Sequence, residues 1–324
     1  MNQTTQMHKI SEALSDFDAT FTPYYATGFE ARLIALGLAD MTIAGKKMAL
    51  RCLNYLHHHA LAIDYGGVAN NYDLVLTCSD QIVPENIRDK PTVLVQEGMV
   101  DPATFLFHVW RHFRRFPRWL AGTACNGQSQ LYDRFCVASE GFRDYFVRYG
   151  ADPEKIVVTG IPNFDDCQAY AEIPFSHRNY VLVCTSDMRE TFKFDNRVRF
   201  IKRAIKIARG RKMIFKLHPN EKPTAEDEIR QHVPNALILR DGSAEVMVAH
   251  ADVVICQLSS LALVALALNK ELHSYFDLDH LERLRPIQNR CAAERIASVC
   301  RELVPPAPAS SRLHIHPIDR GAAA

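Results

Sequence analysis

The stretch Tyr180-Val-Leu-Val-Cys-Thr-Ser-Asp187 decides the fold, together with its later counterpart Asp252-Val-Val-Ile-Cys256. Short apolar runs rich in β-branched residues and closed by polar turns are typical of strands buried on both faces. Helical patterns separate these runs, and strands that alternate with helices predict a parallel sheet covered on both sides. Further strands are expected at 155–159, 212–217, 236–239 and 273–276, and helices at 196–208, 226–232, 244–250 and 259–268.

The helix expected at 196–208 has a clear apolar spacing. Val198, Ile201, Ile205 and Ala208 recur at helical intervals, which predicts that they form its buried face. Gly210 follows the last of them, as is common at the end of a helix.

The first half of the chain carries a weaker version of the same pattern. Strands are expected at 19–25, 74–78, 92–95 and 135–138, and helices at 5–14, 29–38, 45–54 and 142–149. A doubly wound domain normally opens with an apolar strand, and none precedes the helix at 5–14. Either the first strand is missing or the true start lies upstream.

The expected fold class is therefore α/β, with two Rossmann-like doubly wound domains that face a cleft, the first strand of the N-terminal domain being absent. Pro162 and Pro174 interrupt the pattern between the two halves. We expect an acceptor-side domain at 1–160, a nucleotide-sugar-binding domain at 161–304 and a flexible, low-complexity tail at 305–324.

Composition restricts the class of protein. The chain has 324 residues, which is long enough for two domains, and it carries 38 basic against 37 acidic residues. Nucleic-acid binders usually show a marked basic excess, so no nucleic-acid partner is expected. The nine cysteines are odd in number and form no C-x-x-C pair, which favours reduced thiols over disulfides or zinc. The adjacent residues His57-His58-His59 point in different directions and predict no metal site.

Targeting signals are also absent from the sequence. No apolar run reaches the roughly 18 residues of a membrane span, and the polar N-terminus is unlike a secretion signal. A cytoplasmic protein is expected.

Ligands of open parallel sheets bind beyond the carboxyl ends of the strands, so the residues after each strand are the first site candidates. Hydroxyl groups at the start of a helix suit a phosphate, because free backbone N–H groups lie behind them. Cationic and imidazole side chains can add hydrogen bonds to a diphosphate. The candidates of this kind are Thr185, Ser186, Arg189, Lys216, His218, Ser259 and Ser260.

Ordinary structural explanations exist for most of these residues. Ser259 and Ser260 can be a plain helix cap, and Thr185-Ser186 can be a turn. His218-Pro219 is harder to explain by packing alone, because a histidine and a proline at a strand end have no evident packing role.

Three segments of the chain resemble the GT-B superfamily. They are Glu154-Lys-Ile-Val-Val-Thr-Gly-Ile-Pro-Asn-Phe-Asp165, then Lys216-Leu-His-Pro219, then Ala251-Asp-Val-Val-Ile255 with Ser259-Ser260. The resemblance is greatest to the branch with UDP-GlcNAc 2-epimerases, CDP-glycerol glycerophosphotransferases and capsule-polysaccharide glycosyltransferases, and it covers roughly residues 90–280.

This resemblance implies that the C-terminal domain binds a nucleotide-sugar. His218 and Ser259-Ser260 would contact the diphosphate, and Leu239-Arg240 would lie beside the base. Glu97, in Val95-Gln-Glu-Gly98, would face the sugar from the other domain. The chain departs from the epimerases, because the patterns His-x-Glu-Ala-Gly and Glu-Glu-x-Asn-Arg are missing. Glu97 also stands where several transferases have histidine.

We therefore expect a glycosyltransferase-like enzyme that moves a sugar, or a polyol phosphate, from a nucleotide-activated donor to a glycan or lipid-linked acceptor in surface polysaccharide synthesis. Glu97 or Asp101 would be the general base on the acceptor hydroxyl, or else a loop carboxylate paired with an arginine. Ser259 and His218 would stabilise the leaving diphosphate without a metal or other cofactor. The alternatives are a UDP-GlcNAc 2-epimerase-type isomerase and a catalytically inactive nucleotide-sugar-binding module.

Residues 105–120 form the most unusual segment. Phe105, Val109, Phe113, Phe116 and Leu120 recur at helical spacing, and arginines lie mostly on the other faces. Basic amphipathic helices with aromatic residues often lie on anionic membranes, which suits a lipid-linked acceptor and a position at the inner face of the membrane. The alternative is a helix packed on the core with a solvated basic face.

Overall fold

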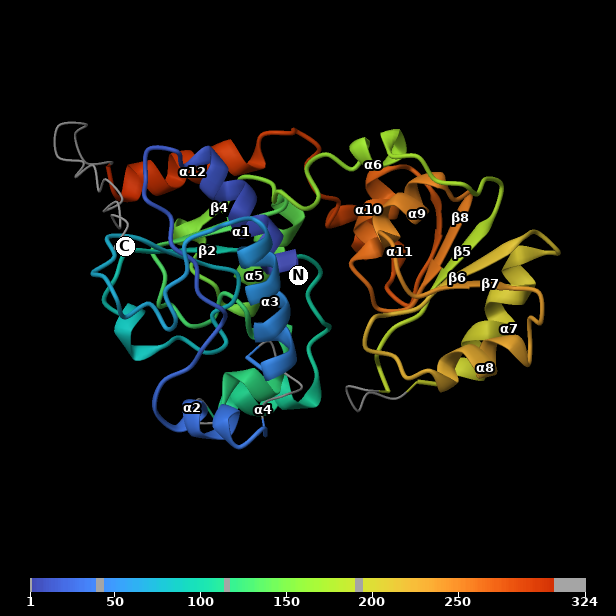
Figure 1. The fold of residues 1–324 in the computed structure, drawn as a ribbon, viewed down its shortest axis with the longest axis horizontal. Coiled ribbons are helices and arrows are strands. Elements are labelled where there is room, and N and C mark those ends of the chain that lie inside the picture. The colour runs from blue at the N-terminus through green and yellow to red at the C-terminus, as the bar shows by residue number, and fades with distance from the viewer. Residues whose placement is uncertain (1, 39–43, 114–116, 190–194, 306–324) are drawn as a thin grey trace, which may run out of the picture.

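The computed structural model describes residues 2–38, 44–113, 117–189 and 195–305. Two parallel β-sheets, each with its own helices, form the two halves of the molecule (Figure 1). This arrangement confirms the expected α/β class with two Rossmann-like sets of strands. The first sheet has the order β1-β2-β3-β4, with strands at Val75–Thr77, Thr92–Val95, Arg134–Val137 and Ile156–Val158. The second has the order β7-β6-β5-β8-β9, with β5 to β9 at Val181–Cys184, Met213–Lys216, Leu237–Leu239, Val253–Cys256 and Glu271–His273.

The order of the second sheet creates a switch point between β5 and β8. The chain runs outward from β5 through β6 to β7, and then returns to the other side of β5 to form β8 and β9. Cys184 at the end of β5 pairs in register with Lys216 of β6 and with Cys256 of β8. The three strands therefore end at the same level, and the residues that follow them share one edge of the sheet.

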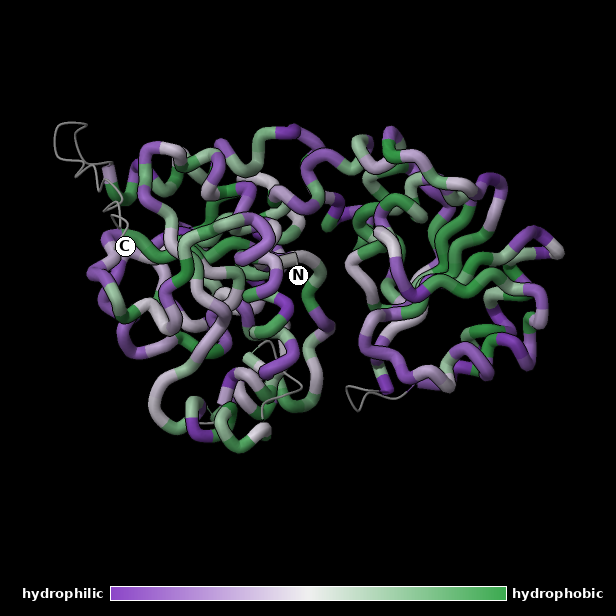
Figure 2. The backbone as a smooth tube through the Cα atoms, in the orientation of Figure 1, coloured by the Kyte–Doolittle hydropathy of each residue, from purple (hydrophilic) through white to green (hydrophobic). Residues whose placement is uncertain are grey.

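Helices cover both faces of the second sheet. Val181 and Val183 of β5 pack in one cluster with Phe200, whereas Leu182 packs with Leu263 in the other, as the alternation of side chains along a strand requires. Figure 2 shows these strands as the most hydrophobic part of this half. One face carries α7 (Arg197–Ala208) and α8 (Thr224–Arg230), and the other carries α9 (Ala244–His250) and α10 (Leu261–Ala267).

The expected buried face of α7 is partly wrong. Val198 and Ile205 are exposed, and the buried residues are Arg197, Phe200, Ile201, Ala204 and Ala208. The helix is rotated so that the large ring of Phe200 and the small Ala204 lie against the sheet. The last strand is also earlier than the expected 273–276, because the chain leaves the sheet at Ser274, whose hydroxyl donates to the carbonyl of Gln257.

The expected strand at 19–25 does not form. Phe21 makes an isolated bridge with Ile63, and Pro23, which has no N–H to donate, follows it. The hydroxyl of Tyr24 donates to the carbonyl of Ser79, so this segment crosses the end of β1 instead of pairing beside it. Before β1 the described residues form three helices and no strand: α1 (Asn2–Ala13), α2 (Gly28–Ala35) and α3 (Lys46–His58).

The expected helix over 105–120 is shorter, and side chains outside the expected apolar stripe hold it to the core. Helix α4 spans Phe105–His112, a short 3-10 helix follows at Arg118–Ala121, and Phe116 lies outside the described residues. The side chains that hold α4 to the core are Phe107 and Trp110. Phe105 and Phe113, which belong to the expected apolar face, are 79% and 69% exposed. The helix therefore packs on the core, as one of the two interpretations expects, but through Phe107 and Trp110 and not through the expected apolar stripe.

The two halves meet at a close contact between α5 (Glu140–Tyr149) and α11 (Leu278–Arg283). A Cβ atom at Gly141 would lie 1.7 Å from the carbonyl oxygen of Arg283, so only glycine fits there. The backbone N–H of Ile287 donates to the carbonyl of Ala138 at 3.1 Å beside this contact.

The last described helix, α12 (Ala292–Leu303), returns to the first half and packs along α1 (Figure 1). Arg301 of α12 pairs with Asp16 at 2.5 Å. The boundaries of the two expected domains stay a prediction. Helix α12 belongs to the expected second domain, 161–304, but it packs on α1 of the first half. From residue 306 on, the expected tail lies outside the described residues. The remaining helices are α6 (Ala169–Glu172) and the 3-10 helices Glu85–Ile87, Thr123–Cys125 and Pro153–Lys155.

All nine cysteines are free, as the sequence predicts. None of the helices in the described ranges is both long enough and apolar enough to cross a bilayer.

Candidate functional site

The residues that follow β5, β6 and β8 are hydrogen-bonded into one continuous rim at the switch point. The hydroxyl of Ser186 donates to Oε1 of Gln257 at 2.6 Å, which joins the loop after β5 to the loop after β8. Thr185 donates to the carboxylate of Glu221, and the same carboxylate accepts the backbone N–H of His218 at 2.6 Å. We call residues 185–189, 217–221 and 257–260 the rim. The structure thus brings together loops that are more than 30 residues apart in the sequence.

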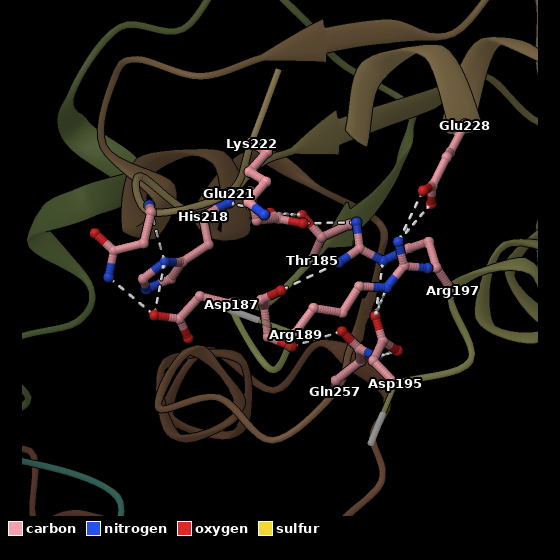
Figure 3. Close-up of polar contacts among 12 residues, drawn as sticks. Thr185, Asp187, Arg189, Asp195, Arg197, His218, Glu221, Lys222, Glu228 and Gln257 are labelled. Carbon is pink, nitrogen blue, oxygen red and sulfur yellow. Dashed lines mark hydrogen bonds and ion pairs between the residues drawn. The ribbon is translucent and has the colours of Figure 1, made fainter. Parts of the chain in front are cut away.

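A buried ionic network connects the loops of the rim (Figure 3). Arg197, the first residue of α7, is 2% exposed, and its Nη1 lies 2.6 Å from Oε1 of Glu221. Its Nε lies 3.1 Å from Oδ2 of Asp195, and its Nη2 donates to the carbonyl of Ser186 at 3.2 Å. The other carboxylate oxygen of Asp195 accepts from Gln257 at 2.7 Å. One buried guanidinium is therefore linked to all three loops of the rim.

Sequence reasoning did not single out this network. Arg197 lies three and four residues before Phe200 and Ile201, which places it on the buried face of α7. A charge on the apolar face of a helix is a detectable signal, because a buried charge requires a partner. The partner itself, Glu221, is found only from the tertiary structure.

The side chains of His218, Ser259 and Ser260 lie on the accessible part of the rim. Nδ1 of His218 accepts the backbone N–H of Asn220 at 3.3 Å and lies 3.5 Å from a carboxylate oxygen of Asp187. An accepting Nδ1 leaves the proton of the neutral ring on Nε2, which can then donate to an anionic oxygen. The hydroxyl of Ser259 accepts the N–H of Leu261 at 3.3 Å, and Ser260 is half-buried.

Thr185 and Ser186 are buried, and both hydroxyls are already bonded within the rim. Arg189 pairs with Glu228 of α8 at 2.7 Å. These contacts fix the shape of the rim. For these three side chains to bind a phosphate, as predicted, each would have to leave its present partner.

The side chains of Lys216 and Arg240 also have partners within the protein. Nζ of Lys216 donates to the carbonyl of Arg240 at 2.6 Å, and burial lowers the pKa of this ammonium group. The guanidinium of Arg240 pairs with Glu226 at 2.6 Å. The half-buried Leu239 ends β7 and pairs in register with Lys216 of β6.

The first half of the molecule contributes the loop after β2. A Cβ atom at Gly98 would lie 3.8 Å from the Cβ of Ser260, so this loop touches the rim. The neighbouring Glu97 accepts a hydrogen bond from Nε2 of Gln3 at 2.7 Å. Burial raises the pKa of the Glu97 carboxyl, and the hydrogen bond from Gln3 lowers it in part. A carboxyl with a raised pKa is a stronger base in its ionised form than an ordinary glutamate.

Glu97 also lines a cavity of about 1800 Å³ that lies along β1. Among the described residues β1 pairs with β2 alone, so its other edge faces this cavity. The walls include Tyr24, Tyr72 and Asp64, and Tyr72 donates to the carboxylate of Asp64 at 2.6 Å. Aromatic rings and carboxylates in one cavity suit a polar, hydroxylated ligand.

Asp101, the other predicted base, is held by Thr123. Its backbone N–H donates to Oγ1 of Thr123 at 2.8 Å, and its carboxylate accepts from the same hydroxyl at 3.1 Å. The two contacts fix the loop between β2 and α4.

Comparisons with known proteins identify the fold. No protein-family model matches the sequence, and no curated protein matches it. Among solved structures, Staphylococcus aureus MnaA in complex with UDP has a TM-score of 0.53 at 12% identity, over 93% of this chain and 94% of that chain. The Neisseria meningitidis UDP-GlcNAc 2-epimerase bound to UDP-GlcNAc has a TM-score of 0.50 at 12% identity, over 91% and 96% of the two chains. The wall teichoic acid polymerase TagF matches with a TM-score of 0.47 at 10% identity, over 92% and 93%.

The likeness extends over nearly the whole chain and shows that it has the GT-B fold. The sequence resemblance to this superfamily is confirmed at the level of the fold, and one of these structures is a UDP-GlcNAc 2-epimerase, a member of the branch that the resemblance indicated.

Proposed function

We propose that the protein is a GT-B-fold enzyme that transfers a sugar, or a polyol phosphate, from a nucleotide-activated donor to a glycan or lipid-linked acceptor. The observation that carries this proposal is the rim at the switch point, whose loop after β8 touches the loop of Glu97. Open α/β sheets bind nucleotides at such switch points. The matched structures that hold UDP and UDP-GlcNAc support a ligand of this class.

In this proposal the diphosphate of the donor lies over His218, Ser259 and Ser260. The Nε2–H of His218 and the hydroxyl groups donate to the diphosphate oxygens, and this stabilises the negative charge that develops as the donor bond breaks. No metal ion is included in the proposed reaction. The base of the nucleotide lies beside Leu239-Arg240.

Glu97 is the general base of the proposed transfer. It removes the proton from an acceptor hydroxyl, the oxygen forms its bond to the donor carbon or phosphorus, and the nucleotide leaves with the electron pair of the broken bond. Its raised pKa and its place on the cavity wall support this role. Asp101 is less suited, because Thr123 holds both its backbone and its carboxylate.

Product analysis with a panel of nucleotide-sugars and CDP-glycerol tests the proposal. We expect release of the nucleotide to depend on an added glycan or lipid-linked acceptor, and the acceptor to gain mass. Inversion at C2 of the sugar in UDP-GlcNAc without any acceptor, seen by NMR, would instead establish the epimerase alternative. Nucleotide-sugar binding without turnover, with or without acceptor, would establish a binding module.

A further inference from the structure

Helix α2 is apolar, yet none of its residues is buried. Its sequence is Gly-Phe-Glu-Ala-Arg-Leu-Ile-Ala, and the ring of Phe29 is 66% exposed. Leu36, which ends the helix, is exposed as well. A helix in a globular protein normally buries its apolar stripe, so α2 lacks the contact that its sequence is suited to make.

Helix α4 adds further exposed apolar groups. Glu30 of α2 and Trp110 of α4 both line one hollow of about 370 Å³. Trp110 anchors α4 to the core, and this orientation leaves Phe105 and Phe113 exposed. Figure 1 shows the two helices at the same end of the first half. Single exposed apolar residues are ordinary, but a group of them on adjacent helices marks an interaction surface.

Basic side chains surround these apolar groups. Exposed cations lie on α2, on α4 and at the start of α3, whose opposite end contacts α1. Carboxylates are present there as well: Glu30 belongs to α2, and a Cβ atom at Gly28 would lie 3.6 Å from Oε1 of Glu85. The resulting α2–α4 surface combines the apolar side chains of Phe29, Leu36, Phe105, Leu106 and Phe113 with the cations of Arg32, Lys46, Lys47 and Arg111.

We infer that the α2–α4 surface docks on an anionic lipid bilayer. Exposed aromatic and leucine side chains would enter the boundary between headgroups and acyl chains, and the cations beside them would contact anionic headgroups. An anionic bilayer matches both the charge and the apolarity of this surface, whereas an apolar protein surface would match its apolar side chains alone. The inference does not depend on the proposed transfer, although it would bring a lipid-linked acceptor to the same half of the molecule as Glu97.

Vesicle flotation with the full chain tests the inference. We expect the protein to float with vesicles that contain phosphatidylglycerol and not with phosphatidylcholine alone, and added salt should weaken the binding. The double variant Phe29→Ser/Phe105→Ser should lower partitioning at least about tenfold, because two aromatic rings no longer enter the bilayer. Val198→Ser/Ile205→Ser is the matched control, since these side chains are 40% and 37% exposed on α7 of the second half, and it should bind like the wild type.

A charge-reversal pair identifies which basic surface makes the contact. Arg32→Glu/Arg111→Glu should abolish flotation, whereas Lys202→Glu/Lys206→Glu, on the exposed basic side of α7, should not. Circular dichroism and size-exclusion chromatography of each variant report folding and oligomeric state. Three results would overturn the inference: no binding of the wild type at low salt, an unchanged affinity of Phe29→Ser/Phe105→Ser, or a dimer that this variant dissociates.

Discussion

Replacing Arg197 by methionine is expected to lower the free energy of unfolding by about 3–5 kcal/mol, the usual loss when one partner of a buried ion pair is removed. The carboxylates of Asp195 and Glu221 would stay buried without the guanidinium that lies within 3.1 Å of both. The rim should lose its shape as well, because Arg197 also donates to the carbonyl of Ser186. Urea unfolding and nucleotide titration of the same sample measure both effects.

Arg199→Met is the control for this prediction, because Arg199 is exposed on the same helix. It should change stability by less than about 0.5 kcal/mol. The double variant Arg197→Met/Glu221→Gln should recover part of the lost stability, since Glu221→Gln removes one of the two buried negative charges that lose their partner with the arginine. An Arg197→Met protein as stable as the wild type would show that the network does not hold the rim.

Replacing Glu97 by glutamine is expected to reduce kcat/KM by about 10²–10⁴, the range for loss of a general base. The same change should stabilise the protein at neutral pH. Burial raises the pKa of Glu97 above its unfolded value, so its contribution to stability is present below the unfolded pKa and is lost as the pH rises through the folded pKa. Glutamine carries no charge to bury, so Glu97→Gln should melt higher than the wild type at pH 7 but not near pH 4.

Two companion variants test the assignment of the base. Gln3→Ala removes a hydrogen bond that lowers the pKa of Glu97, so the acidic limb of the kcat/KM profile should move to higher pH. Asp101→Asn should retain most of the activity, because Thr123 holds this residue within its loop. If Asp101→Asn were the inactive variant and Glu97→Gln the active one, the assignment would be reversed.

Much of the second half could be predicted from the sequence, because its central strands are short, almost purely apolar runs. The run ending at Cys184 and the run ending at Cys256 are the clearest, since β5 and β8 are buried on both faces. The edge strand β7 was predicted within one residue, whereas the other edge strand, β9, was expected too late in the sequence. β9 carries the exposed Glu271, so its pattern is not that of a buried strand.

The first half was harder to predict because its contacts are irregular. The segment 19–25 is rich in apolar and aromatic residues but is fixed by side-chain contacts such as that of Tyr24 with Ser79. Phe105 and Phe113 do lie at helical spacing, but a periodic apolar stripe in a sequence does not show whether the stripe faces the core or the solvent. Here it faces outside.

The position of the rim could be predicted from the sequence, but the hydrogen bonds within it could not. Parallel strands end together, so the positions of Ser186, His218 and Ser259 followed from the strand ends alone. The sequence does not show which of these polar groups bond to one another, because the partners are distant in the sequence, as Thr185 and Glu221 are. The cavity beside β1 is likewise formed by segments that only the folded chain brings together.

The central claim is that the rim binds a nucleotide through its diphosphate, and calorimetric titration tests it most directly. Each nucleoside diphosphate is compared with its parent nucleoside, for the wild type, for His218→Ala/Ser260→Ala and for the exposed control His58→Ala. We predict that one diphosphate binds far more tightly than its nucleoside, and that His218→Ala/Ser260→Ala alone raises its Kd by at least about tenfold, as lost hydrogen bonds to a charged group would. Equal affinity for nucleoside and diphosphate, or an unchanged Kd in His218→Ala/Ser260→Ala, would contradict the claim.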